Sequence, residues 1–374
     1  MRVVAGIAGA VLIALMLSEF FVTFMLPRRV RRDPRIARGL IRLFWRPWRV
    51  FARRLSTSSA DTFLGLFGPL ALLSELLTWT VGLILGFALL EYAAVGGGFG
   101  HGILFSSGLF LSAEGASGST ALHVIALIEA AIAIGVLFIV IGYLPAVYGS
   151  FSRREVAVSQ LATRAGSPPA AGAILCRAAQ RERWQELERD LRGWEEWAAE
   201  LMETHLSYPI LGYYRSQHVN QNWLAALTAM VDVAAFVTAV EADGESEAAE
   251  TTFAIGRHAL ADLSLQYRVR YGKVERLSEA DFDQLYDAVE AAASRPVGRD
   301  EALRRLTELR RAYEPKAQGL ADWLALELPP WLRAEDKQEL VRLPGVRVGD
   351  YGRDLVGQSP RRQVRQRDRL QDST

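Results

Sequence analysis

The sequence is poor in cysteine and, over a long central stretch, in basic residues. Cys176 is the single cysteine among 374 residues, which excludes an internal disulfide bond and fits a reducing compartment. Residues 55–152 contain no lysine or arginine. The surface of a soluble protein carries charges of both signs, so we expect this stretch to lie in a membrane rather than in water.

Sequence patterns that carry catalytic or cofactor chemistry are also missing. There is no phosphate-binding glycine loop and no Gly-x-Ser-x-Gly nucleophile motif. The histidines His205, His218 and His258 lack the spacing of zinc ligands. No compact basic face accompanies the aromatic residues, as it does in nucleic-acid-binding proteins. We therefore expect neither an enzyme nor a bound metal or cofactor, and no nucleic-acid partner.

Three apolar segments are long enough to cross a bilayer, whose hydrocarbon core of about 30 Å needs ~20 helical residues. They are residues 3–26, 63–94 and 122–147. The first segment has only Arg2 before it and a basic block after it. That pattern is typical of a retained anchor and not of a cleaved signal peptide.

The basic residues predict how these segments are oriented. Residues 28–54 contain 11 arginines and one acid, whereas the loop at 95–120 has no basic residue. Arg153 and Arg154 follow the third segment. Because basic loops stay in the cytoplasm, we expect an N-terminus outside and a C-terminal part inside, in the plasma (inner) membrane.

The basic stretch at 28–54 also carries apolar residues at helical intervals, namely Leu40, Leu43, Phe44, Trp48 and Phe51. Two interpretations stay open. The stretch is either an amphipathic helix that lies along the inner leaflet and attracts anionic lipid, or a charged linker that only sets the topology.

The loop between the second and third segments has the layout of a pore loop. It begins with a glycine-rich stretch at 96–102, continues with about three apolar helical turns at 103–112, and ends in small residues at 113–120. Non-helical backbone is tolerated at membrane depth only where protein buries it or where it lines water. The pattern predicts a short re-entrant helix.

Several strings of residues resemble a bacterial family of potassium-channel-like proteins that has an extra N-terminal transmembrane helix and a helical cytoplasmic domain. The strings are FMLPRRV at 24–30, FGPL at 67–70, IGYLP at 141–145, FSRRE at 151–155, RAGSPP at 164–169 and YYRSQH at 213–218. The resemblance extends from the first apolar segment to about residue 270. It implies a two-helix channel unit with a pore loop, assembled as a homotetramer.

The filter region departs from the family pattern. Ser107-Gly108 is present, but no Gly-Tyr-Gly follows it, because Gly115 and Gly118 are three residues apart. A potassium filter needs successive carbonyls turned toward one axis, and Glu114 replaces a residue of that pattern. Four copies of Glu114 would form a carboxylate ring that attracts monovalent cations; the alternative is a solvated loop acid. The candidate pore residues are Ser107, Ser112, Ala113, Glu114, Gly115 and Gly118.

The apolar segments contain acids and glycines with two possible roles. A charge at the bilayer centre costs roughly 3 kcal/mol, so Glu19, Glu75, Glu91 and Glu129 are expected to line a pore or to be protonated between helices. Gly82 and Gly86 have the spacing of a close helix contact. In the third segment, Glu129, Gly135, Gly142 and Pro145 are the candidate hinge or gate residues, although its glycines equally suit packing.

The part after residue 152 is expected to be helical. Predicted helices cover 182–204, 247–267, 278–292 and 299–313, and a further helix starts at Ser167 with that serine as its cap. The apolar stretch at 222–242 carries Asp232 and lacks flanking arginines, which favours a buried core helix over a fourth span. The polar cluster around His205 and Tyr213 is either a ligand surface or a corner fixed by hydrogen bonds.

These observations predict an all-α protein with three transmembrane helices, a re-entrant pore loop between the second and third, and a helical cytoplasmic domain. The predicted parts are an N-terminal helix at 1–27, a basic linker at 28–61, a pore-type module at 62–149, a helical domain at 150–345 and a disordered tail at 346–374. Two functions fit: a cation channel with a non-standard filter, or a non-conducting relative that acts as a membrane-anchored scaffold or sensor.

Overall fold

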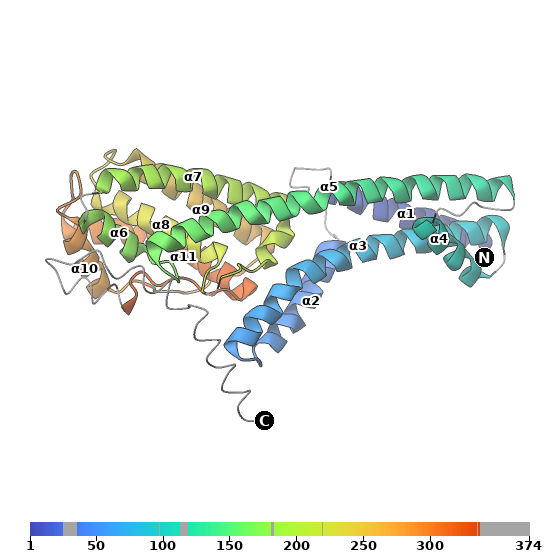
Figure 1. Cartoon of the computed structure of the whole chain (residues 1–374), viewed down its shortest axis with the longest axis horizontal. Coiled ribbons are helices and arrows are strands. Elements are labelled where there is room, and N and C mark those ends of the chain that lie inside the picture. Colours follow the sequence, from blue (N-terminus) through green and yellow to red (C-terminus); the bar gives the residue numbers. More distant parts are fainter. Residues whose placement is uncertain are drawn as a thin grey trace, which may run out of the picture. The chain divides into compact units, whose positions relative to one another are not determined.

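The computed structural model describes residues 1–24, 36–96, 98–112, 119–180, 183–218, 220–334 and 336. This described part is all-helical, with 81% helix and no strand (Figure 1). Its eleven α-helices and one 3₁₀ helix are α1 (Arg2–Phe24), α2 (Ile36–Ala52), α3 (Thr57–Val95), α4 (Phe99–Ser112), α5 (Thr120–Ala165), α6 (Ala171–Gln180), α7 (Trp184–Ser207), η1 (Pro209–Tyr213), α8 (Trp223–Val240), α9 (Glu247–Tyr267), α10 (Glu279–Val289) and α11 (Arg299–Leu324).

The chain divides into two units, Met1–Trp331 and Leu332–Thr374. All named helices belong to the first unit. In the second unit the Arg333 guanidinium pairs with the Asp336 carboxylate at 2.6 Å. The division falls at Trp331, before the predicted tail at 346–374, which lies outside the described residues.

Four helices are long and apolar enough to cross a membrane: Arg2–Thr23, Ser59–Val95, Thr120–Ala165 and Trp223–Val240. The second and third contain the segments predicted at 63–94 and 122–147, and the first covers residues 3–23 of the segment predicted at 3–26. The fourth, α8, differs because 94% of its apolar window is buried inside the protein. It packs against α6, α9 and α11, which confirms the prediction of a core helix.

α1 and α3 form a close antiparallel pair. Their contact buries Ile13, Met16 and Phe20 of α1 against Trp79, Leu83 and Phe87 of α3. Small residues allow the approach, because a methyl group added at Gly9 would lie 2.6 Å from the Gly86 carbonyl oxygen. A methyl group on Gly86 would likewise meet Ile13 Cγ1 at 2.6 Å. The predicted close-contact role of Gly86 is therefore confirmed.

The core of the helical part contains a buried ionic network. Arg276 donates two hydrogen bonds to the Asp232 carboxylate, at 2.6 and 2.9 Å, and one to Glu314 at 3.0 Å. The Tyr313 hydroxyl donates to the same Asp232 at 2.5 Å. Burial alone lowers the pKa of Arg276, but the Asp232 charge and its hydrogen bonds outweigh burial and raise it. Asp232 thus serves as a core acid and not as a membrane-embedded one.

Two helix limits differ from the sequence prediction. Ser167 does not cap a helix, because α5 ends at Ala165, Gly166 adopts a φ of +79°, and α6 begins only at Ala171. α11 continues through Pro315 to Leu324, eleven residues past the predicted end. The prolines after Ser167 therefore do not begin a helix, whereas Pro315 lies inside one.

Candidate functional site

The predicted pore loop is described only in part. Ala113, Glu114, Gly115 and Gly118 lie outside the described residues, and Ser112 is described only as the last residue of α4. α4 forms the predicted short helix and packs against α3 and α5. Ser107 is half-buried on this helix.

A buried polar cluster joins α4 to the two long helices beside it. Ser106 of α4 is fully buried, and its hydroxyl contacts the Glu129 carboxyl of α5 and lies 3.2 Å from the Ile84 carbonyl of α3. One hydroxyl has a single proton to donate. A neutral Glu129 that donates from Oε1 to Ser106, with Ser106 donating to Ile84, accounts for both short contacts, while Glu129 Oε2 has no partner among the described residues. The arrangement fits the protonated acid that the sequence offered as one role for Glu129.

A second acid lies close to this cluster. Glu91 of α3 is 4% exposed, and neither of its carboxyl oxygens has a hydrogen-bond partner in the described part of the chain. Its charge would repel that of Glu129. Two buried carboxylates without cationic partners are unfavourable, so at least one of them is expected to carry a proton.

The other hinge candidates lie on a different side of α5 from Glu129. Gly135, Gly142 and Pro145 are exposed, whereas Glu129 is fully buried. Within the described residues, nothing except the helix's own backbone would lie within 4 Å of a methyl group added at either glycine. The four candidates therefore do not act as one group in a single chain.

The two glycines and the proline belong to a longer exposed row along α5. Its members follow one another at alternating spacings of four and three residues, the spacing that keeps side chains on one helix face. The row consists of Val124, Ile128, Ala131, Gly135, Phe138, Gly142 and Pro145, all of them exposed. Only 11% of the apolar window of α5 is buried within the chain, compared with 44% for α3. We call this row the open face of α5.

The C-terminal part of α5 is fixed to η1 by one buried arginine. Arg154 is 3% exposed, and its guanidinium donates to the Leu211 carbonyl at 2.9 Å, the Tyr214 carbonyl at 3.1 Å and the Glu155 carboxylate at 2.8 Å. Its Cζ lies 5.0 Å from the centre of the Phe151 ring. Arg154 thus ties the helix that leaves the apolar module to the connection between α7 and α8.

A fully buried histidine completes this contact. His205 Nδ1 lies 2.8 Å from the Leu201 carbonyl and Nε2 lies 3.3 Å from Arg154 Nη1. Nδ1 must donate to the carbonyl, and Nε2 must accept from the guanidinium, so the ring is neutral. Burial and the Arg154 charge lower the pKa of His205 to about 3. This geometry supports the hydrogen-bonded corner among the two interpretations of the cluster.

Three of the strings that carry the family resemblance meet at this corner. FSRRE (151–155) supplies the arginine and its acid, and YYRSQH (213–218) supplies a carbonyl acceptor and a serine hydroxyl that donates to the same acid at 3.1 Å. FGPL (67–70) completes the contact, because a methyl group added at Gly68 would lie 2.6 Å from the ring of Tyr214. The strings therefore share a structural junction.

α2 and the chain after η1 also hold the end of α11. Helix C-termini leave carbonyl groups without helical partners, and three side chains donate to them here. They are Trp45 Nε1 to Trp323 O at 2.7 Å, Arg49 Nη1 to Asp322 O at 2.6 Å, and Arg215 Nη2 to the Leu324 and Ala325 carbonyls at 2.8 Å each. The basic segment after α1 is thus bound to the helical part.

Sequence reasoning missed these junction residues. Trp45 is separated from Trp323 by 278 positions, and periodicity reports only which side of one helix is apolar. Comparisons with family models, with curated proteins and with solved structures found no match to this chain. The proposals below therefore rest on the sequence and the structure.

Proposed function

We propose that the chain is a channel-like integral membrane protein of the potassium-channel-like type, with α1, α3 and α5 crossing the membrane and α4 as the pore helix. The observation that carries this proposal is the open face of α5. A helix that met only lipid would have no reason to align small residues and a proline in one row. A 4-3 row with glycines suits close packing against other helices at a shallow angle.

A homotetramer brings four copies of this face around one axis. In that arrangement the open faces of α5 line or close the central path. Gly135, Gly142 and Pro145 then occupy the positions of a gate. Glu129, on the other side of α5, holds the pore helix in place through Ser106 rather than facing the path.

The charges support the predicted orientation. Arg49 of α2 and Arg154 of α5 both contact the helical part, through α11 and η1 respectively. Both basic segments therefore belong to the same side of the membrane as that part, and the positive-inside rule makes it the cytoplasmic side. We place the protein in the plasma (inner) membrane with its N-terminus outside.

The corner around Arg154 gives the helical part a route to the gate. α5 is one continuous helix from Thr120 to Ala165, so a shift of the helical domain would move its apolar part as well. The permeating ions would be monovalent cations, attracted by the Glu114 ring, and selectivity for potassium by the usual carbonyl filter is not expected.

The alternative is a non-conducting relative that retains the assembly and serves as a membrane-anchored scaffold or sensor. It is favoured by the missing Gly-Tyr-Gly pattern after Ser107-Gly108. The contacts around Arg154 and at the end of α11 would then transmit conformational changes of the membrane part to the helical part, without an ion path.

Flux measurements decide between the two functions. The full chain is reconstituted in liposomes, its oligomeric state is determined by native mass spectrometry, and potassium and sodium fluxes are measured separately. We expect a tetramer that passes both ions. A confirmed tetramer with no flux of either ion above that of empty vesicles would refute the channel and leave the scaffold.

The carboxylate ring has its own test in the same vesicles. Glu114→Gln removes four charges from the loop and should lower the conductance of cations. Glu279→Gln is a matched control that removes an exposed acid at the start of α10, and it should leave conductance unchanged. Equal conductance of Glu114→Gln and the unmodified chain would show that Glu114 is a solvated loop acid.

A further inference from the structure

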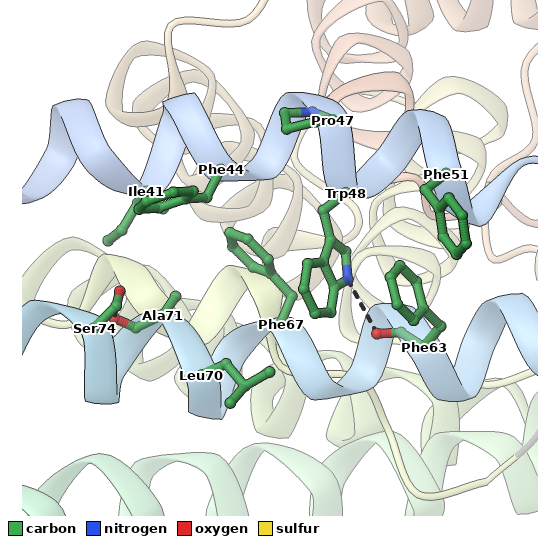
Figure 2. Close-up of a pocket in the computed structure, with 10 residues that line it drawn as sticks. All are labelled: Ile41, Phe44, Pro47, Trp48, Phe51, Phe63, Phe67, Leu70, Ala71 and Ser74. Atoms are coloured by element: carbon green, nitrogen blue, oxygen red, sulfur yellow. Dashed lines mark hydrogen bonds between the residues drawn. The ribbon is translucent and has the colours of Figure 1, made fainter.

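Two cavities of similar size in this chain differ in the chemistry of their walls. The cleft between α2 and the first turns of α3 has a volume of about 440 Å³ and mostly apolar and aromatic walls (Figure 2). Its Trp48 indole and Ser74 hydroxyl both donate to backbone carbonyls of α3, at 3.1 and 2.8 Å, so its chemistry does not select one kind of ligand. A second cavity, of about 410 Å³, has both aromatic and charged walls. Its volume falls within the range of about 300–1,000 Å³ that is usual for small-molecule sites.

The second cavity lies between α5 and α7, after the apolar part of α5. α5 contributes residues of its last turns, α7 contributes residues of its middle turns, and the fully buried Met230 of α8 also lines the cavity. The groups that decide its chemistry are the side chains of Arg164, Arg189, Asp190, Trp194 and Trp197, together with the backbone at Gly193. At about 100° per residue, the five of these positions that belong to α7 fall within an arc of about 140°. One ligand can therefore touch the rings and the charged groups of α7 together.

The aromatic part of the lining comes from two tryptophans. Trp194 and Trp197 are three residues apart on α7, and both are partly buried. Indole faces stack on planar rings, and nucleobases bind proteins through such contacts. The thioether of Met230 adds a polarizable group of the kind that packs well against aromatic rings. This part of the cavity thus suits a planar ring system.

The charged part of the lining has a net charge of +1, from two arginines and one aspartate. Arg164 of α5 forms an ion pair with Asp190 of α7. Arg189 is exposed and forms no ion pair with another residue in the described part of the chain. Guanidinium groups bind phosphate and carboxylate oxygens through charge-assisted hydrogen bonds. This part of the cavity thus suits an anionic group.

Gly193 leaves open space on the same face of α7. A glycine inside a helix is less stable than an alanine there, so an internal packing contact would be the simplest reason to have one. No such contact exists among the described residues, because nothing except the glycine's own stretch of helix would lie within 4 Å of a methyl group added at Gly193. The bare backbone instead leaves room in the cavity for a ligand.

We propose that this cavity binds a purine mononucleotide, with its base against Trp194 and Trp197 and its phosphate at Arg189 and Arg164. A planar base joined to a phosphate uses both parts of the lining. An uncharged aromatic molecule would leave the arginines unused, and an inorganic anion would leave the indoles unused. The sequence has no phosphate-binding glycine loop, so side chains hold the phosphate here. The proposal is independent of whether the protein conducts ions.

Calorimetric titration of the full chain in detergent with AMP, and separately with GMP, tests the proposal. Adenosine is the matched ligand without the phosphate, and ribose 5-phosphate is the matched ligand without the base. We expect one nucleotide to bind per chain, and each of the two shortened ligands to bind about tenfold more weakly or worse, because stacking and a charge-assisted hydrogen bond are both lost in part.

Two results of these titrations would overturn the proposal. No saturable binding of either nucleotide in the millimolar range would show that the cavity does not take this class of ligand. Equal affinities of AMP and ribose 5-phosphate would show a surface that attracts any anion, without a site for the base.

Substitutions test the position of the ligand. Arg189→Gln should weaken AMP binding by about tenfold and leave adenosine binding unchanged. Arg192→Gln is the matched control, at an exposed arginine of α7 that does not line the cavity, and it should change neither affinity. Trp194→Leu should weaken the binding of AMP and adenosine by the same factor. Gly193→Leu should abolish AMP binding by filling the cavity, while thermal unfolding shows that the chain stays folded.

The variants also state what would refute the assignment. An equal loss of AMP and adenosine affinity in Arg189→Gln would remove the phosphate from this arginine. Unchanged AMP affinity in a folded Gly193→Leu would place the nucleotide outside the cavity. If Gly193→Leu does not fold, an unchanged AMP affinity in both Arg189→Gln and Trp194→Leu leads to the same refutation.

Discussion

The neutral, buried His205 predicts a pH dependence of local stability at the corner of α5 and η1. Its pKa is about 3 in the folded protein, because of burial and the Arg154 charge, whereas the pKa of an exposed histidine is about 6.5. When the corner opens, His205 takes up a proton at any pH below about 6.5. When it is closed, His205 stays neutral. The contribution of His205 to stability is therefore fully present above pH 6.5 and is lost as the pH falls toward 3.

The magnitude follows from the two pKa values. Between pH 7 and pH 5 the open state gains about 0.7 of a proton, because an exposed histidine with a pKa of about 6.5 is already partly protonated at pH 7, while the closed state gains almost none. Linkage then lowers the free energy of opening by about 2 kcal/mol over this range. The loss continues at about 1.4 kcal/mol per pH unit below pH 5, until the folded-state pKa is reached.

Hydrogen exchange on the full chain in detergent measures this free energy, after correction for the pH dependence of intrinsic exchange. The relevant peptides cover the end of α7 and η1. His205→Asn should lower protection at pH 7 and also remove about 2 kcal/mol from the difference between pH 7 and pH 5. His258→Asn is the control, since the His258 side chain is 60% exposed, and it should retain the full difference. A pH difference in His205→Asn as large as that of the unmodified chain would refute the neutral, buried state of His205.

Two further predictions concern packing and the buried network. Gly9→Ala should destabilise the α1–α3 pair by about 1–3 kcal/mol, because its methyl group would meet backbone atoms of α3 at 2.6–3.1 Å. The measurement is thermal unfolding in detergent, and the control is Gly65→Ala, whose methyl group would lie 3.7 Å from Arg215 Cγ and which should be neutral or stabilising. Equal unfolding midpoints for the two variants would contradict the close contact. Tyr313→Phe should lower the free energy of unfolding by denaturant by about 1.5–3 kcal/mol, since the Tyr313 hydroxyl donates to the buried Asp232 carboxylate. Tyr271→Phe, at an exposed tyrosine, should leave the free energy of unfolding nearly unchanged. An equally small effect of Tyr313→Phe would show that this hydrogen bond does not stabilise the core.

The sequence was informative where the signal is local. The helices predicted at 247–267 and 278–292 begin within one residue of the observed starts, where Ser246 and Ser278 each accept a backbone N–H as the cap. The apolar run of α8 was separated from a membrane span by Asp232, and the structure explains why: a core arginine neutralises this acid. The basic stretch at 28–54 left two interpretations open, an amphipathic helix or a charged linker. The described part of it forms α2, a helix with one apolar side.

Long-range contacts set the limit of that reasoning. Nothing near Trp45 or Arg49 in the sequence indicates that they bind the end of α11, because their partners are carbonyl oxygens that every residue possesses. The position of Glu129 was equally hidden. Helical spacing places it on the side of α5 away from Gly135 and Gly142, but only the position of α4 shows that this side is the buried one. The candidate hinge residues of α5 therefore divide into Glu129, which packs against α4, and the two glycines, which lie on the exposed side.

The junction residues also change what the family-like strings mean. FGPL, FSRRE and YYRSQH looked like separate markers along the chain, and they prove to be three sides of one contact around Arg154 and Tyr214. This contact contains no catalytic or ligand-binding group, and it lies where α5 leaves the apolar module. If α5 moves relative to α3, either Arg154 must release the carbonyls of η1 or η1 must move with it. Releasing a buried arginine from its acceptors costs several kcal/mol, so the corner would move as one body with α5. Any bend of α5 would then lie N-terminal to Phe151, where Gly142 and Pro145 are residue types at which a continuous helix bends most readily.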